Sequence, residues 1–301
     1  MSATLKYIVI PIALALPLFG AYYAWTYYFK PQAVAIASAA SSTTPVATIQ
    51  EAPVQFVDTT DPNELVPDLV PLPPQDIKIK TREDGAIMLL FSTTYYNQGR
   101  GSLELRADPK TKGIRADIDR DILQRIYRKD EKEKYREKVV GNFLWHQEHQ
   151  HYHYSDFVTY DLEAVDAPGA PDLSGMRTKS TFCLRDVSRV DMELDYRAEE
   201  ANFRVCYKEI QGVSVGWGDT YFYDYPDQGL NISDLTSGTY RLSFHVNPEE
   251  RLDEISLQNN KSSALLKINM EEKTVEVLEL IPSEYPTFEH IHLEQPFGLG
   301  I

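Results

Sequence analysis

Four of the seven histidines of this 301-residue chain lie within eight residues, at His146, His149, His151 and His153. Side chains along a strand point alternately to opposite faces, so His149, His151 and His153 would project from one face. On a helix only His149 and His153 would align. His146 has the opposite parity and would join the others only through a bend. The spacing therefore predicts a strand that brings three imidazoles to one ion.

Imidazole nitrogen binds copper, zinc, nickel and iron. Three histidines with no carboxylate or thiolate among them leave coordination positions open, as a catalytic metal requires. The alternative is a surface histidine cluster that responds only to pH. Three imidazoles at alternate positions favour the metal site, although the spacing alone does not select copper over zinc.

The stretch from Trp145 to His153 reads WHQEHQHYH and resembles the WHxxHQHYH copper strand of the lysyl oxidase family. The resemblance extends from about Leu65 to Ile268, and further similar segments occur in the family's order. These are LVPDLV at Leu65 for L-P-D-L-V, KSTFCL at Lys179 for K-A-S-F-C-L, DTY at Asp219 for D-T-Y, GTY at Gly238 for G-N-Y, HVNP at His245 for V-N-P, and NN at Asn259 for N-N.

The resemblance implies a copper-dependent amine oxidase with His149, His151 and His153 as copper ligands. Lys179 and Tyr221 match the pair that forms the family's self-derived cofactor, lysine tyrosylquinone. Its formation needs a neutral amine, so we expect Lys179 where burial or nearby cations lower its pKa. The enzyme would oxidise primary amines, including peptidyl lysine, to aldehydes with O2, releasing ammonia and hydrogen peroxide. Without the resemblance, these two residues would suggest only a surface lysine and a core tyrosine.

The chain departs from the family pattern at the catalytic base. A histidine soon after the copper strand serves as the family's proposed base, and Thr159 occupies that position here. Asp156, Asp161, Asp219 and His245 are the candidates to replace it, and the sequence does not choose among them. The animal enzymes are also rich in disulfides, unlike this chain, so collagen and elastin are not assumed as substrates.

The resemblance also implies a second, oxygen-rich site suited to calcium. Asp68, Glu254, Asn259 and Asn260 match the family's ligands, while Ser256 replaces an aspartate. The alternative role of these side chains is to cap turns.

The chain has two cysteines, Cys183 and Cys206. An even pair in an exported domain predicts one disulfide, which for a loop of this size stabilises the fold by about 3 kcal/mol. Two buried free thiols are the alternative. Neither cysteine lies in a CxxC spacing.

The elements that must position these residues read as short strands. Residues 87–91 form an apolar run that ends at Asn97-Gln98-Gly99, and residues 240–246 alternate strictly until Asn247-Pro248. Residues 263–269 and 274–280 continue the pattern. The charged stretch 119–138 suits a helix or a hairpin, of which we favour the hairpin. Together these patterns predict an all-β fold, an antiparallel β-sandwich.

The N-terminus predicts a membrane anchor within residues 1–30. Residues 7–29 carry no charge, and 23 helical residues at about 1.5 Å each match the roughly 30 Å of a bilayer. A cleaved signal peptide is the alternative, with Ala35-Ile36-Ala37 or Ala37-Ser38-Ala39 as the cleavage site. Residues 31–65, rich in Ala, Ser, Thr and Pro, predict a flexible linker, and residues 66–301 the catalytic domain. We expect that domain outside the cytoplasm, at the cell surface or in a periplasm or secretory lumen.

The net charge of −15 argues against nucleic acid as a partner. It weakly favours cationic substrates, or reflects only a solvated acidic surface. Three classes of protein therefore remain: the amine oxidase, an exported copper- or zinc-binding module without turnover, and a structural wall protein. The histidine strand would have no purpose in the third class, which includes adhesion proteins, and Lys179 and Tyr221 favour the first class over the second. Nothing in the sequence indicates an oligomeric state.

Overall fold

A computed structural model describes residues 60–111, 120–130, 134–146, 151–173, 178–190, 193–207, 209–225 and 228–283. All of them belong to the second of two compact units, which comprises residues 54–301. The expected anchor at residues 7–29 and most of the expected linker lie outside them. Within the described ranges, no helix is long and apolar enough to cross a bilayer.

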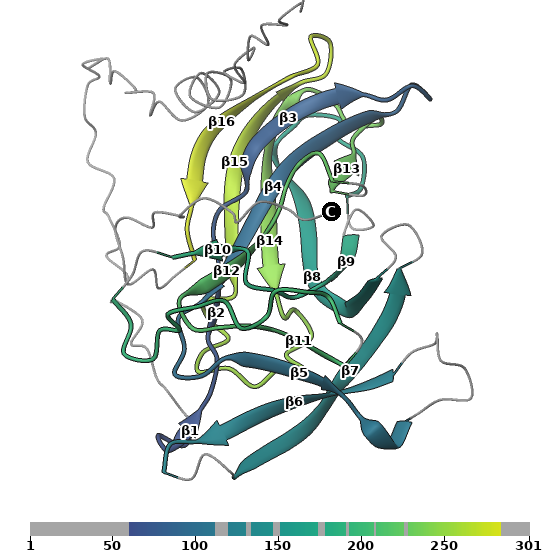
Figure 1. Cartoon of the computed structure of the whole chain (residues 1–301). Coiled ribbons are helices and arrows are strands. Elements are labelled where there is room, and N and C mark those ends of the chain that lie inside the picture. The colour runs from purple at the N-terminus through teal and green to yellow at the C-terminus, as the bar shows by residue number, and fades with distance from the viewer. Residues whose placement is uncertain are drawn as a thin grey trace, which may run out of the picture. The chain divides into compact units, whose positions relative to one another are not determined.

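The described chain forms two sheets in which every strand pair is antiparallel (Figure 1). The larger sheet runs β11 (Ile210–Val213), β5 (Leu103–Ala107), β6 (Arg120–Arg128), β7 (Tyr135–His146), β8 (His151–Asp166), β14 (Gly238–Val246), β15 (Lys261–Asn269) and β16 (Thr274–Ile281). Two further strands pair with it, β1 (Glu64–Leu65) on β6 and β9 (Thr178–Phe182) on β8.

The smaller sheet is built on β4 (Ile87–Asn97). Its order is β10 (Ser188–Arg189), β12 (Trp217–Tyr221), β4 and β13 (Gly229–Asn231), with β2 (Leu69–Pro71) and β3 (Gln75–Thr81) also paired to β4. A single 3-10 turn, η1 (Pro109–Thr111), is the only helix among the described residues. The all-β, antiparallel part of the prediction is confirmed.

The individual strand predictions also hold. The charged stretch is the β6–β7 hairpin, in which Tyr127 pairs with Tyr135. Of β14, Tyr240, Leu242, Phe244 and Val246 are buried, as the alternation of residues 240–246 predicts.

The expected linker boundary at residue 65 is too late. Glu64 and Leu65 form β1 and pair with Arg128 and Tyr127 of β6. The Glu64 carboxylate also accepts a 2.8 Å hydrogen bond from the Arg136 guanidinium. These pairings, which the local composition does not reveal, order the chain before residue 66.

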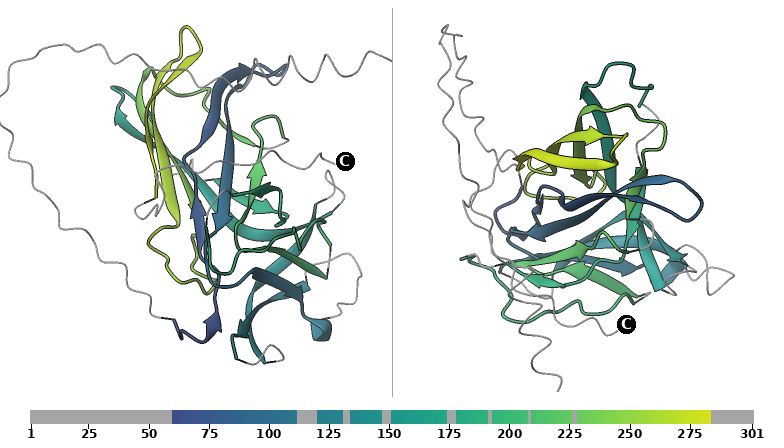
Figure 2. Two further views of the ribbon diagram at one scale, coloured as in Figure 1. Left: turned by 60° about the vertical axis from the view of Figure 1, so that its left-hand side comes forward. Right: turned by 90° about the horizontal axis from the view of Figure 1, so that it is seen from above.

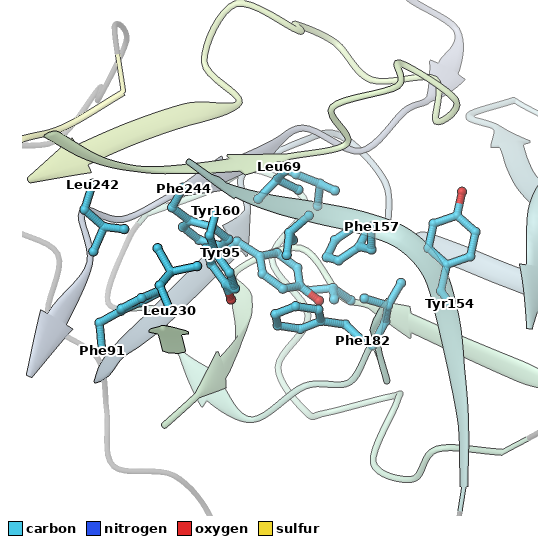
Figure 3. Packing of buried hydrophobic residues seen from close by; sticks show 14 of the residues in the cluster. Leu69, Phe91, Tyr95, Tyr154, Phe157, Tyr160, Phe182, Leu230, Leu242 and Phe244 are labelled. Atoms are coloured by element: carbon cyan, nitrogen blue, oxygen red, sulfur yellow. The ribbon is translucent and has the colours of Figure 1, made fainter. Parts of the chain in front are cut away.

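Aromatic rings from both sheets fill the core (Figure 3). Phe91 of β4 packs edge to face on Tyr160 of β8, with ring centroids 4.9 Å apart. Tyr95 of β4 packs in the same way on Phe157, also at 4.9 Å. These contacts place β4 opposite β8, an arrangement that can be followed from two other sides in Figure 2. Such pairs contribute about 0.5–1.5 kcal/mol each beyond the area that they bury.

Strand β8 links the core to the histidines. Its first residues pair with β7, and its later residues pair with β14 on one side and β9 on the other. The register with β9 shifts between Tyr154 and Val158, and Asp156 there has φ of 53°. This irregularity divides β8 into a histidine-bearing beginning and a core-forming end.

Candidate metal and cofactor site

The histidine segment is a hairpin rather than one continuous strand. Strand β7 ends at His146 and β8 begins at His151, and these two residues pair directly. His146 was expected to join the other histidines only through a bend, and the chain does reverse between His146 and His151. His149 lies in residues 147–150, outside the described residues, so its expected position on the common face stays a prediction.

The hairpin brings three imidazoles together. The Nε2 atoms of His151 and His153 are 2.9 Å apart, which confirms that these two alternate residues share a face. The His146 ring stacks on that of His153, with centroids 4.7 Å apart and planes 11° apart. The reversal between β7 and β8 supplies the bend through which His146, despite its opposite parity, joins the others.

The His151 and His153 pair fits a shared metal ion. Two nitrogens, each about 2.0 Å from one ion and at right angles, would be about 2.8 Å apart. The observed 2.9 Å separation matches that spacing, although a proton shared between the rings would also hold them together. His153 is only 2% exposed, so an ion at its Nε2 would be shielded on one side by the fold.

Thr181 fixes the orientation of His153. The threonine Oγ1 lies 3.0 Å from His153 Nδ1, while Nε2 faces His151. If Nε2 binds a metal, Nδ1 carries the proton, and this N–H donates a hydrogen bond to Thr181 Oγ1. Partners of this kind set the tautomer and the ring position of metal-binding histidines.

Tyr221, at the end of β12, contacts the same segment. Its hydroxyl oxygen accepts a 2.9 Å hydrogen bond from the Cys183 backbone N–H. Its ring packs on Phe182, with centroids 3.8 Å apart. Burial, reinforced by the charge of Asp219, raises the pKa of Tyr221 well above 10. The phenol is therefore neutral at physiological pH and held in one position.

Lys179 belongs to the strand that joins these groups. Its backbone pairs with Thr159 of β8, two residues before Thr181. Its side chain lies outside the described part of the structure, so its distance from Tyr221 and the pKa expected for its amine stay predictions. Residues 179–183 thus run from the lysine, past the partner of His153, to the group that binds the Tyr221 hydroxyl.

The predicted disulfide between Cys183 and Cys206 is present. One imidazole nitrogen of His151 and both sulfurs lie within 4.8 Å of one another. Sulfurs joined in a disulfide are not thiolate ligands. In this form the pair therefore braces the histidine cluster instead of binding a metal.

Of the four candidate bases, Asp219 is the one whose charge contributes to the raised pKa of Tyr221. Asp219 is 1% exposed, and its Oδ2 atom has no hydrogen-bond partner among the described residues. Burial raises the pKa of Asp219 to about 8, against the opposing charge of Arg185. A carboxyl with that pKa changes protonation state near neutral pH, as a base must.

The other candidates have different surroundings. Asp156 forms an ion pair with Arg251 at 3.5 Å. Asp161 and His245 alternate with the buried Tyr160 and Phe244. His245 pairs with Thr159, which in turn pairs with Lys179, so both candidates project from the same face of the sheet as the lysine.

The four residues expected at the calcium site lie close together and are buried. The Asn259 amide lies 3.2 Å from both carboxylate oxygens of Asp68, and the Asn260 amide donates to Glu254 at 2.8 Å. Ser256, in the position of the missing aspartate, instead donates its backbone N–H to Asp68 at 3.2 Å.

The calcium-site residues fit a divalent cation. Two buried carboxylates face the same region, and burial, with the charge of Asp68, raises the pKa of Glu254 to about 8. The Oδ1 atoms of Asn259 and Asn260 are buried without hydrogen-bond partners among the described residues. Carboxylate and amide oxygens are the ligands that calcium prefers.

A cavity of about 890 Å3 lies beside Tyr221's neighbours. Tyr225, whose ring packs edge to face on Tyr221 at 5.9 Å, lines it together with Thr178 and Gln228. Acidic and basic side chains complete the lining, among them Asp224, Glu83 and Lys80. The cavity thus reaches one neighbour of each residue of the expected cofactor pair, Thr178 before Lys179 and Tyr225 beside Tyr221.

The chain matches the family model described as lysyl oxidase over residues 117–279, more than half of its length. It is 36% identical over 120 residues to lysyl oxidase homolog 2B of Danio rerio, a match covering 40% of this chain and 14% of that protein. It is also 36% identical to lysyl oxidase homolog 4 of Homo sapiens over 120 residues, 40% of this chain and 15% of the relative. Protein-lysine 6-oxidase of Rattus norvegicus is 37% identical over 117 residues, 38% of this chain and 26% of the relative. The match thus spans about a quarter or less of each relative.

We predict that Thr181→Val weakens copper binding by about 10- to 100-fold, because His153 loses the partner that orients its ring. Thr181→Ser keeps the hydroxyl and should bind copper like the wild type. Competition with a chromophoric chelator measures both affinities. Equal affinities in the valine and serine variants would show that the hydroxyl does not orient the histidine.

Proposed function

This chain belongs to the lysyl oxidase family, and we propose that it is a copper-dependent amine oxidase. It would convert primary amines, including lysine side chains of proteins, to aldehydes with O2 and release ammonia and hydrogen peroxide. The observation that carries the proposal is the 2.9 Å approach of two imidazole nitrogens, His151 and His153, beside the strand that holds the Tyr221 hydroxyl.

The residues divide the work between metal and cofactor. His149, His151 and His153 would hold copper, which supplies one-electron chemistry with O2. Lys179 and Tyr221 would form the lysine tyrosylquinone cross-link. The Cys183 N–H and the Phe182 ring fix the tyrosine in position before it reacts.

We further propose Asp219 Oδ2 as the atom that removes a proton from the substrate carbon next to nitrogen. It is buried, it lacks a hydrogen-bond partner among the described residues, and it affects the ionisation of Tyr221. The positive charge of Arg185 lowers the pKa of Asp219 and would stabilise the Asp219 carboxylate before it accepts the proton.

The location of the protein is likewise a proposal. A disulfide persists in an oxidising compartment, so the Cys183–Cys206 bond supports a catalytic domain outside the cytoplasm. Residues 1–30 would anchor it to a membrane, and the residues between that anchor and β1 would serve as the tether.

The main prediction concerns turnover. Copper-loaded protein under air should release peroxide with a panel of primary amines, while Lys179→Ala and Tyr221→Phe should fall to the level of metal-free protein. Tyr196→Phe and Lys267→Ala change exposed residues of the same types and should retain activity. Equal turnover in all variants would remove the proposed mechanism.

The same preparations distinguish the oxidase from a metal-binding module without turnover. Mass spectrometry of a digest should find one cross-linked species containing Lys179 and Tyr221. Two separate, unmodified peptides after aerobic copper loading would mean that the cofactor does not form.

Asp219→Asn should lower kcat/KM by about 10²- to 10⁴-fold, the usual contribution of a catalytic base. Since the base must be deprotonated, wild-type kcat/KM should rise as pH increases through about 8, the pKa of Asp219. That rise should be absent in the asparagine variant and retained in Asp161→Asn. A rise that survives Asp219→Asn would assign the proton transfer to another group.

The calcium site yields a prediction about stability. Without a cation, protonated Glu254 contributes to the free energy of unfolding. This contribution is complete below pH 4.5, the pKa of Glu254 in the unfolded chain, and is lost as pH rises through about 8, its pKa in the folded chain. Calcium should therefore raise Tm more at pH 8 than at pH 5, by roughly 5–10 °C at 100 times Kd. Glu254→Gln should abolish the difference, and Glu271→Gln at an exposed position should keep it. A Tm that is insensitive to calcium at both pH values would leave these side chains as turn caps.

A further inference from the structure

The Cys183–Cys206 bond lies beside His151 of the histidine cluster. Both sulfurs and one imidazole nitrogen of His151 are within 4.8 Å of one another. Cys183 is buried, whereas Cys206 is partly exposed and its neighbours Val205 and Tyr207 are 48% and 57% exposed. A reductant in solution can therefore reach this bond from the Cys206 side.

We propose that, once this disulfide is reduced, His151, Cys183 and Cys206 form a binding site for a soft cation, Cu(I). Two thiolates with one imidazole are ligands that such cations prefer, unlike the all-imidazole set proposed for the oxidase centre. The site uses His151 in both redox forms, so the two ligand sets share one residue.

The spacing of the cysteines suits this role. Their Cα atoms are 5.5 Å apart. Two thiolates on one tetrahedral ion, with metal–sulfur bonds of about 2.3 Å, would be about 3.8 Å apart. Rotation about the Cα–Cβ bonds accommodates that change while the backbone stays in place.

The backbone around both cysteines has a second support that reduction does not break. Gln211 is fully buried, and its Oε1 accepts a 3.1 Å hydrogen bond from the N–H of Leu184, next to Cys183. Its Nε2 donates to the carbonyl of Tyr207, next to Cys206, at 3.3 Å. The same amide donates to Tyr152, between His151 and His153, at 2.7 Å. All three ligands are therefore held near one another independently of the disulfide.

Reduction is a balanced thiol–disulfide exchange with a dithiol. One dithiol thiolate attacks Cys206 Sγ, the sulfur–sulfur bond breaks, and Cys183 leaves as a thiolate. The second dithiol sulfur then attacks the mixed disulfide and releases Cys206. Two electrons and two protons pass from the dithiol to the protein, and the dithiol becomes a cyclic disulfide. Binding of Cu(I) then displaces the thiol protons.

The reverse exchange, with a disulfide as oxidant, removes both thiolate ligands and leaves the ion on His151. Because His151 also faces His153 at 2.9 Å, this would deliver copper to the oxidase centre. This last step rests on the proposed function, whereas the thiolate site does not.

The test compares the two redox forms of the full chain under anaerobic conditions. Protein reduced with a phosphine, which is then removed, is titrated with Cu(I) against a chromophoric Cu(I) chelator. We expect one ion per chain, bound at least 100-fold more tightly than by the disulfide form. X-ray absorption should show two sulfur neighbours. Equal affinity in both forms, or a spectrum without sulfur, would overturn the proposal.

Variants separate ligands from the scaffold. Cys206→Ser and His151→Ala should each lower the Cu(I) affinity of the reduced chain by at least 10-fold, while Lys267→Ala, at an exposed position of β15, should not. Near-ultraviolet circular dichroism of the reduced wild type must remain native, because binding by an unfolded chain would also overturn the proposal.

Amine-dependent peroxide release by the disulfide form loaded with Cu(II) is measured in parallel. If the disulfide form is active but the reduced form shows no sulfur ligation, only the proposed thiolate site is wrong. If the reduced form shows sulfur ligation but the disulfide form is inactive, only the proposed oxidase function is wrong.

Discussion

The buried side-chain amide of Gln211 is the interaction on which the candidate site depends. It binds the backbone beside three functional residues: Tyr152 between the histidines, Leu184 after Cys183, and Tyr207 after Cys206. Leaving a buried amide without partners costs about 1–3 kcal/mol of stability per lost hydrogen bond. Separating these three segments would therefore destabilise the folded chain. This common attachment holds together the backbone next to both cysteines and both paired histidines, and Cys183 in turn binds the Tyr221 hydroxyl.

Strand β9 and the residue after it turn that attachment into a reactive arrangement. Within five residues it carries Lys179, the Thr181 partner of His153, the Phe182 surface for Tyr221, and Cys183. A shift of β9 by one residue against β8 would turn each of these side chains to the other face. The register of a short strand therefore governs the metal ligands and the cofactor tyrosine together.

Much of this was predictable from sequence where a residue's surroundings repeat. Strict alternation in residues 240–246 identifies β14, and the two-residue spacing of His151 and His153 places them on one face. The parity of His146 indicated that a bend would be needed, but not that the chain reverses before His151, because residues 147–150 contain none of the Gly, Pro, Asn or Asp that mark turns. The role of Gln211 was equally hidden, since it arises from partners distant in the chain. Asp219 was one of four candidate bases, and only its burial in the structure distinguishes it. Three-dimensional context also corrected the linker boundary, because β1 depends on pairing with β6 rather than on local composition.

Two buried carboxyls show where stability has been given up. Asp219 and Glu254 are 1% and 7% exposed, and burial raises the pKa of each to about 8, so both are costly to ionise. Asparagine and glutamine have nearly the same shape and would avoid that cost. Natural proteins tolerate such conflicts mainly at functional sites. Asp219 influences the tyrosine of the expected cofactor, where a charged carboxylate could accept a proton. Glu254 lies near Asp68, where two carboxylates could bind a cation. The cost of burying these two carboxyls is therefore explained by function rather than by packing.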